Sequence, residues 1–370
     1  MPHEKEHQRE HLRRESRVRG MMLGLALGDT LGGARGRLPA GGPLRAGVST
    51  QLACFTAEGI IRAQVRGNHK GICYAPGVVL HGYCRWAFLQ GIEVEQMRRR
   101  WASSGDAVWP DGWLAGVPAL AERRGSAPAT VTALARIGEG QERMATTSRG
   151  CHALTRTLPV AVTGIGGIAQ AGELAALTHG DTAAQAATVH AAVLAHHCLT
   201  HSAAERGPSP HSGGSALEAL HAGITALPSV GQRITDDEHS RLVAAFRQAV
   251  DEPADAGRLA RLAPDATAPS ALLGGLYAAA SFPDRAGFRA ALEFAAGAPD
   301  GESVACVAGA LLGAVHGVET LPVDLVNRHE LAWVLDTLAR DLLMELEDSP
   351  SGSEYVQGWD PHWWNRYPGW

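Results

Sequence analysis

The strongest constraint on the fold is a stretch rich in small residues near the start of the chain, residues 18–33. Glycine and alanine side chains allow one helix to lie close against others. At helical spacing, Leu23, Ala26 and Leu27 share one face of such a helix. The stretch therefore predicts a helix of the core that packs tightly among its neighbours.

A second core helix is predicted over residues 47–63. Ser49 and Thr50 are residue types that cap exposed backbone N–H groups, so we expect the helix to begin with them. The apolar residues that follow form a stripe at roughly helical spacing: Leu52, Phe55, Ile60 and Ala63. This stripe indicates the face that the helix buries.

Helical spacing of apolar residues recurs along the rest of the chain. The segments concerned are residues 76–91, 171–199, 216–250 with a break near Pro228, 270–280, 285–296 and 331–346. Residues 98–149 contain many Gly, Pro, Ser and Thr residues, and we expect surface loops there with a short helical patch near 114–124. Because the alternating Val/Ile-rich segments of strands do not recur, we predict an all-α protein with a single compact multi-helix domain.

We place the boundaries of this domain at residues 18 and 348. Residues 1–17 are charged and polar with almost no apolar side chains, so we expect a flexible arm or a frayed helix. Residues 349–370 form a tail that contains Trp359, Trp363, Trp364 and Trp370. We expect the tail to dock onto the domain, because an exposed patch that apolar would promote association.

Charge and cysteine content argue against several classes of protein. The 370 residues carry a formal net charge of −5, which gives no general electrostatic reason to bind nucleic acid or an anionic membrane. No apolar run approaches the ~20 residues that span a bilayer, and the N-terminus is charged. The 6 cysteines include no Cys-x-x-Cys pair, so we expect buried free thiols, a reducing compartment and a cytoplasmic protein.

Residues 18–33 also resemble the opening helix of the ADP-ribosylglycohydrolase family, Gly-x-Leu-x-Gly-x-Ala-x-Gly-Asp-Ala-Leu-Gly. Asp29 stands on the aspartate of that pattern, which in the family lies close to the ligand; the alternative is a carboxylate that caps a neighbouring loop. The family usually continues with Ala-Pro-x-Glu, and this chain does not. The resemblance thus implies the family's all-α fold with a central site, from which a glutamate that closes over the ligand is missing.

Residues 148–162 resemble a family stretch that lies along bound ADP-ribose, Ser-Lys-Gly-Cys-Gly-x-x-Met-Arg-x-x-Pro. The matching residues are Ser148, Gly150, Cys151, Arg156 and Pro159. His152 replaces a glycine, and an imidazole there either narrows the site or lies on the surface. His179 falls in a Leu-Thr-His-Gly sequence that also matches the family; the alternative for it is an ordinary loop at a helix end.

The magnesium ligands of the family are only partly present. The family helix begins Ser/Thr-Asp-Asp-Thr-Gln-Leu, whereas Thr50 directly follows Ser49 here, so both aspartates are missing. The later motif Gly-Asp-x-Asp-Ser/Thr is matched by Asp300, Glu302 and Ser303. Magnesium prefers six oxygen ligands in near-octahedral geometry. We therefore expect at most one weakly held Mg²⁺, with Thr50, Asp300, Glu302 and Ser303 as its ligands, and no binuclear centre.

The resemblance leaves three hypotheses open. The first is a divergent hydrolase of ADP-ribosyl or related N-glycosidic bonds that uses Asp300 and Glu302 as acid and base or as ligands to one ion. The second is a pseudoenzyme that binds ADP-ribose, an NAD-like molecule or an ADP-ribosylated protein without cleaving it. The third is the family scaffold reused for other small-molecule chemistry.

Overall fold

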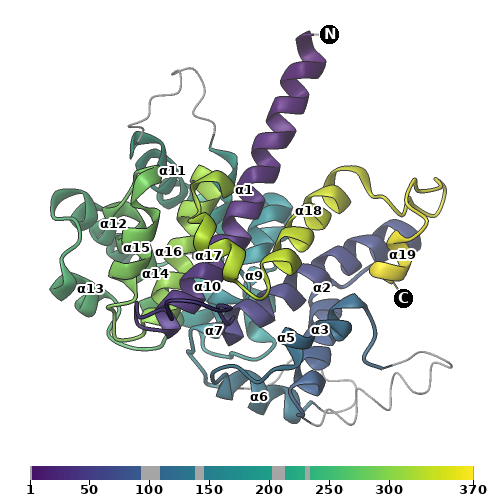
Figure 1. The fold of residues 1–370 in the computed structure, drawn as a ribbon, viewed down its shortest axis with the longest axis horizontal. Helices are drawn as coiled ribbons and strands as arrows, with labels where there is room; N and C mark the ends of the chain where they lie inside the picture. Colours follow the sequence, from purple (N-terminus) through teal and green to yellow (C-terminus); the bar gives the residue numbers. More distant parts are fainter. Residues whose placement is uncertain (1, 93–108, 138–145, 202–212, 230–233, 370) are drawn as a thin grey trace.

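The computed structural model describes residues 2–92, 109–137, 146–201, 213–229 and 234–369. Within these ranges the chain forms helices and loops with isolated β-bridges and no β-strand (Figure 1). The all-α prediction is confirmed. No helix in the described part of the chain is long and apolar enough to cross a membrane.

The helices follow one another along the chain with short connections. The α-helices are α1 (Pro2–Gly33), α2 (Val48–Lys70), α3 (Ala75–Leu89), α5 (Pro118–Ala121), α6 (Pro128–Ala135), α7 (His152–Thr155), α8 (Gly164–Ile168), α9 (Ala171–Ala176), α10 (Thr182–Thr200), α11 (Gly213–Ala226), α12 (Asp236–Asp251), α13 (Ala256–Leu262), α14 (Ala268–Ser281), α15 (Phe288–Ala295), α16 (Gly301–His316), α17 (Val323–Arg328), α18 (Ala332–Asp348) and α19 (Trp363–Arg366). The 3₁₀ turns are η1 (Trp113–Gly116), η2 (Leu158–Thr163), η3 (Leu227–Ser229), η4 (Arg285–Gly287) and η5 (Val318–Thr320).

The core is built on α1 and α16, which pack backbone against backbone. A Cβ atom added to Gly24 would lie 2.2 Å from the carbonyl oxygen of Gly309, and one added to Gly28 would lie 2.0 Å from that of Ala305. The contact continues in both directions through the pairs Gly20 with Gly313 and Gly32 with Gly301. Since these residues recur every fourth position, they lie on one face of each helix. The predicted close packing of residues 18–33 is therefore confirmed, and the helix against which they pack is α16.

The second predicted core helix is α2, and its apolar stripe is buried as expected, with Leu52 and Phe55 0% exposed. Its start is different from the prediction. The capping position is Gly47 and carries no side-chain cap, so the prediction that Ser49 and Thr50 cap this helix is wrong. The hydroxyl of Ser49 instead lies 2.9 Å from that of Thr155, because neighbouring elements close over this end of the helix.

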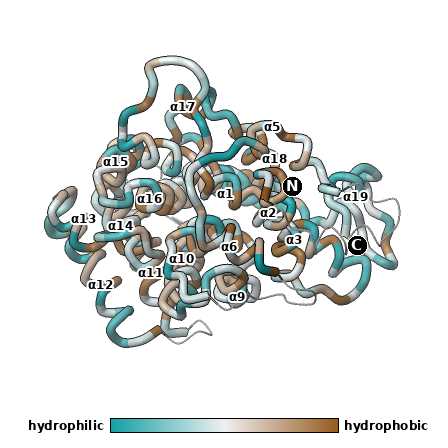
Figure 2. The backbone as a smooth tube through the Cα atoms, turned by 90° about the horizontal axis from the view of Figure 1, so that it is seen from below, coloured by the Kyte–Doolittle hydropathy of each residue, from teal (hydrophilic) through white to brown (hydrophobic). Residues whose placement is uncertain are grey.

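Other differences from the predicted elements are local. The helical run over residues 171–199 is broken into α9 and α10 by a loop at residues 177–181, where Asp181 caps α10 by accepting from the N–H groups of Ala183 and Ala184. The loop-rich region 98–149 contains the additional helix α6, and its residues 98–108 and 138–145 lie outside the described residues. In Figure 2 the outer helices α12 and α13 carry long hydrophilic stretches, as expected for amphipathic helices at the surface.

The N-terminal segment extends helix α1, and the C-terminal tail packs onto the helical domain. Residues 2–17 form the first turns of α1, which project from the protein in Figure 1, so the arm takes the helical form of the two alternatives. In the tail, Trp363 is buried and donates its Nε1–H to Glu345 (2.7 Å), and the Tyr367 hydroxyl donates to Asp341 (2.6 Å). Trp359 remains 59% exposed, and Trp370 lies outside the described residues. Flexibility of residues 1–17 stays a prediction.

A single methyl group tests the contact between α1 and α16. We expect Gly24→Ala to lower the free energy of unfolding by ~1–3 kcal/mol, because its Cβ would overlap the Gly309 carbonyl and force two helices apart. Chemical denaturation of the purified variant measures this change. Gly33→Ala is the control on the same helix, since the nearest atom to its added Cβ is the Glu302 carboxylate at 3.6 Å. Equal stability of the two variants would contradict the tight contact.

Candidate active site

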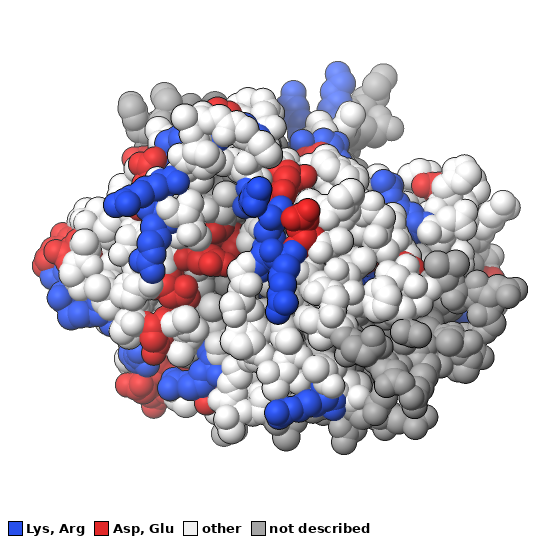
Figure 3. Space-filling model, turned by 60° about the horizontal axis from the view of Figure 1, so that its bottom comes forward, with Lys and Arg blue, Asp and Glu red and all other residues white. Residues whose placement is uncertain are grey.

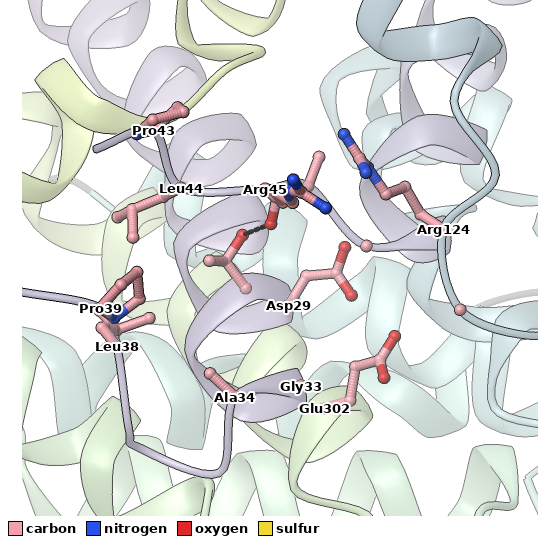
Figure 4. Close-up of a pocket in the computed structure, with 14 residues that line it drawn as sticks. Asp29, Gly33, Ala34, Leu38, Pro39, Pro43, Leu44, Arg45, Arg124 and Glu302 are labelled. Atoms are coloured by element: carbon pink, nitrogen blue, oxygen red, sulfur yellow. Dashed lines mark hydrogen bonds between the residues drawn. The ribbon is translucent and has the colours of Figure 1, made fainter. Parts of the chain in front are cut away.

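A cavity of about 390 Å³ opens where the end of α1, the loop before α2, the loop at residues 124–125 and the first turn of α16 meet (Figure 4). It is lined by Asp29, Thr30, Gly33, Ala34, Leu38, Pro39, Pro43, Leu44, Arg45, Ala46, Gly47, Arg124, Gly125 and Glu302. A cavity of this size is within the range of small-molecule sites. In Figure 3, acidic side chains gather in a hollow of the surface, with basic side chains on both sides.

Asp29 is the most buried carboxylate of the cavity, at 1% exposed. Its Oδ2 accepts hydrogen bonds from the backbone N–H (2.9 Å) and the hydroxyl (2.5 Å) of Thr50. Asp29 therefore does for α2 what Ser49 and Thr50 were expected to do. Its Oδ1 is buried without a hydrogen-bond partner, and burial raises the pKa of Asp29 above its ordinary value. The alternative that Asp29 caps a neighbouring segment is therefore observed, and its place beside a ligand stays a prediction.

Gly47 is required beside Asp29 for steric reasons. A Cβ atom at position 47 would lie 2.5 Å from Oδ1 and 2.7 Å from Oδ2 of Asp29. Only glycine lets the loop before α2 pass this close to the carboxylate. The loop therefore forms a wall of the cavity directly against its buried acid.

Glu302 faces Asp29 from the first turn of α16 (Figure 4). Burial, followed by the negative charge of Asp29, raises the pKa of Glu302 to about 8. Two carboxyl groups that face each other in a largely buried site do not both ionise easily, so Glu302 keeps its proton at neutral pH. A proton held by a carboxyl group beside a second carboxylate is the arrangement that general acid catalysis needs.

Asp300 lies immediately before α16 and is not among the residues that line the cavity. Its Oδ2 accepts a hydrogen bond of 2.5 Å from the hydroxyl of Ser303. The thiol of Cys151 lies next to this pair: burial, and then the charge of Asp300, raise the pKa of Cys151 well above its ordinary value. The first turn of α16 is thus brought against the segment that begins at residue 148.

That segment is held in place by backbone contacts with the start of α14. The N–H of Cys151 donates to the carbonyl of Ala266 (3.0 Å), and Gly150 forms an antiparallel bridge with Thr267. The hydroxyl of Ser148 accepts from the N–H of Gly150 (3.2 Å), which tightens the turn. A Cβ at position 150 would come within 3.1 Å of the His179 ring, so the glycine allows this imidazole to pack against the backbone.

Arg156 and His179 are buried behind this segment, and His152 is half-buried beside them. The Arg156 guanidinium lies 4.3 Å from the Tyr83 ring centroid and donates to Thr130 (3.1 Å) and to the Leu174 carbonyl (3.2 Å). Burial, and then the charge of Arg156, lower the pKa of His152 to about 4 and that of His179 to about 2. Both imidazoles are therefore neutral at physiological pH. None of the three lines the 390 Å³ cavity.

Two arginines of the cavity were not identified from the sequence. Arg45 is exposed at the rim, and Arg124 binds the Glu330 carboxylate through Nη2 at 3.1 and 3.2 Å while its Nε has no partner. Both lie in loops rich in Gly and Pro, where an arginine carries no spacing pattern that would mark it. Their approach to Asp29 depends on how the loops fold over α1.

The described residues do not fit a metal centre built from several acidic side chains. No group of three or more His, Cys, Asp or Glu side chains is placed to hold a metal ion in the part of the chain that the structure describes. Oδ2 of Asp29 is occupied by Thr50, and Oδ2 of Asp300 by Ser303. A binuclear magnesium site needs several carboxylates that converge on the ions. Among the residues that the structure describes, only Asp29 and Glu302 contribute carboxylates to the lining of the cavity.

The chain belongs to the ADP-ribosylglycohydrolase family, because the model of that family, described as ADP-ribosylglycohydrolase, matches residues 10–351. It is also similar to a solved structure described as an ADP-ribosylglycohydrolase-related protein complex, with 23% sequence identity and a TM-score of 0.53, over 89% of this chain and 98% of the other. At this identity the second match shows the fold alone. No curated protein matches the sequence. The family resemblance seen in the sequence is confirmed.

The raised pKa of Glu302 predicts a pH-dependent stability difference. Its pKa is about 8 in the folded protein against 4.5 for an ordinary glutamate, so the folded state loses stability as the pH rises through this interval. Glu302→Gln removes the group that must ionise. The melting temperature of Glu302→Gln relative to the natural protein should therefore increase from about pH 5 to about pH 8.5. Glu293→Gln, on the exposed face of α15, is the control. A relative melting temperature of Glu302→Gln that stays constant or falls with pH would show that the pair is not protonated at neutral pH.

Proposed function

We propose that this protein is a divergent ADP-ribosylglycohydrolase that cleaves ADP-ribosyl or related N-glycosidic ribose bonds with reduced or altered dependence on metal. The observation that carries the proposal is the pair Asp29 and Glu302, two carboxyl groups that line one 390 Å³ cavity, where burial and the charge of Asp29 raise the pKa of Glu302 to about 8. The chain's membership of the family supports the substrate class. The ligand is an ADP-ribose-like small molecule or an ADP-ribosylated protein, and we place the reaction in the cytoplasm.

In the proposed reaction the bond between the ribose anomeric carbon and the leaving nitrogen breaks, and a bond from that carbon to a water oxygen forms. Glu302 donates its proton to the leaving nitrogen, and a carboxylate of the pair takes the proton that the water loses. The remaining negative charge stabilises the cationic character of the sugar in the transition state. Asp300 acts from the adjacent turn by positioning Ser303 and the start of α16.

The anionic part of the ligand would be bound by Arg45 and Arg124, which line the cavity on the side of the loops. Guanidinium groups bind phosphate oxygens with paired hydrogen bonds. Residues 148–156 and His179 do not line the cavity, so they would act on the ligand indirectly, by supporting the first turn of α16. We expect at most one Mg²⁺, held weakly by oxygens of Thr50, Asp300, Glu302 and Ser303.

A second candidate is a protein that binds ADP-ribose without cleaving it. It is favoured by the lack, among the described residues, of a cluster of acidic and histidine side chains that could hold a metal ion. The third candidate is the family scaffold reused for other small-molecule chemistry. Binding and turnover measurements separate these three functions.

Isothermal titration with ADP-ribose, with and without Mg²⁺, is the direct test. We expect binding in both conditions, with little change on adding the ion. Arg45→Gln should weaken binding about tenfold, because it removes a charge-assisted contact to the ligand, and Arg45 forms no ion pair with any residue in the described part of the chain. Arg123→Gln is the matched control, since Arg123 is exposed, precedes Arg124 and does not line the cavity.

Turnover of ADP-ribosyl-arginine decides between cleavage and binding alone. Glu302→Gln should retain ADP-ribose binding and lose at least about 100-fold in rate, the usual contribution of a general acid. Binding without turnover in the natural protein, at any pH and with or without Mg²⁺, would establish the non-catalytic binder. A lack of any binding would instead favour the reused scaffold.

A further inference from the structure

A second, smaller cavity of about 70 Å³ lies among α10, α12 and α14. It is lined by Arg149, Ala183, Ala187, His190, Glu238, Arg241, Leu242, Pro269, Leu272 and Leu273. None of these residues lines the 390 Å³ cavity. The proposed hydrolase chemistry therefore gives this cavity no role.

His190 is the polar group at the buried side of this cavity. It lies in the middle of α10, its side chain is 3% exposed, and its Nε2 has no hydrogen-bond partner. Burial lowers the pKa of His190 to about 4, so the ring is neutral at physiological pH. A buried ring nitrogen without a partner is costly, and most such groups in folded proteins are satisfied. A ligand that reaches Nε2 would remove this cost.

Two arginines lie at the open side. Arg241 is exposed and forms no ion pair with any residue that the structure describes, although Glu238 lies one turn before it on α12. Glu238 is held by Thr235, whose N–H and hydroxyl donate to its Oε2 at 3.0 and 2.8 Å. Arg149 is 55% exposed, with its Nε 3.6 Å from Asp181. The mouth of the cavity therefore offers a positive charge without a fixed partner.

The walls between His190 and the arginines are apolar. They are formed by Ala183, Ala187, Leu242, Pro269, Leu272 and Leu273. Space of 70 Å³ corresponds to about two water molecules at ~30 Å³ each, so it takes up the far end and part of the chain of a ligand whose charged end stays at the open mouth. The cavity thus combines a cationic mouth, a short apolar passage and a polar floor.

We infer that this cavity binds a short-chain carboxylate whose far end carries a hydroxyl or oxo group. The carboxylate binds Arg241 at the mouth, the aliphatic chain packs between the leucines, and the polar end bonds Nε2 of His190. The site is separate from the proposed active site, so its test and the test of the hydrolase function are independent.

The probe is 4-hydroxybutyrate, titrated at constant ionic strength into the full chain while the histidine ring signals are followed by NMR. The signal of His190 is identified by its disappearance in His190→Gln. We expect a saturable shift of this signal, and butyrate, which lacks the hydroxyl, should bind at least about tenfold more weakly. No shift of the His190 signal, or equal affinity for butyrate, would overturn the inference.

The arginine is tested on the same helix. Arg241→Gln should weaken 4-hydroxybutyrate about tenfold, whereas Arg247→Gln, an exposed arginine of α12 that does not line the cavity, should leave the affinity unchanged. Because both arginines are exposed, neither substitution removes packing from the core. Equal weakening by the two variants, or an equal shift with sulfate in place of the carboxylate, would show only general attraction of anions and would overturn the inference.

Discussion

The contact between the backbones of α1 and α16 determines where the candidate site lies. Because small residues recur every fourth position on both helices, the two approach closely from Gly20 to Gly32 of α1. The contact ends at Gly32, where an added Cβ would lie 2.3 Å from the Gly301 carbonyl oxygen and 2.6 Å from the Glu302 Cα. The antiparallel pair therefore brings Asp29, near the end of α1, against Glu302, in the first turn of α16. A larger residue along this contact would separate the two carboxyl groups.

Closing the loop before α2 over Asp29 changes the chemistry of that pair. The loop can pass only because position 47 is glycine, and it removes water from a carboxylate whose Oδ1 then has no partner. Burying charge without full compensation is costly, and side chains kept in that condition inside a cavity are typical of functional sites. The same burial gives Glu302 its proton at neutral pH. The buried Asp29, which accepts hydrogen bonds from Thr50 and faces Glu302, therefore affects both the stability of the fold and the proposed catalysis.

The sequence predicted where the helices lie, but it predicted their ends poorly. The apolar stripe of α2 was predicted correctly because helical periodicity is a local property, but the capping by Ser49 and Thr50 was wrong because Asp29, 21 residues away, supplies the hydrogen bonds. The Ala-rich run predicted one helix over residues 171–199, but the break between α9 and α10 falls at His179, where a loop at a helix end was the stated alternative. Among the site residues, Asp29 and Glu302 were named from the family pattern. Arg45, Arg124 and Gly47 were missed, since nothing in a loop sequence shows which cavity the loop will cover.

By itself the sequence determined the all-α class, the close-packing helix at residues 18–33 and the family. These follow from periodicity, residue size and sequence motifs, all of which are properties of residues that lie close together in the sequence. Only the tertiary structure decided that Asp29 and Glu302 share a buried cavity, that Asp300 and Arg156 do not line it, and that His190 faces a second one. Burial, and with it each pKa, arises when segments distant in the chain exclude water from the same point, and no local pattern specifies that.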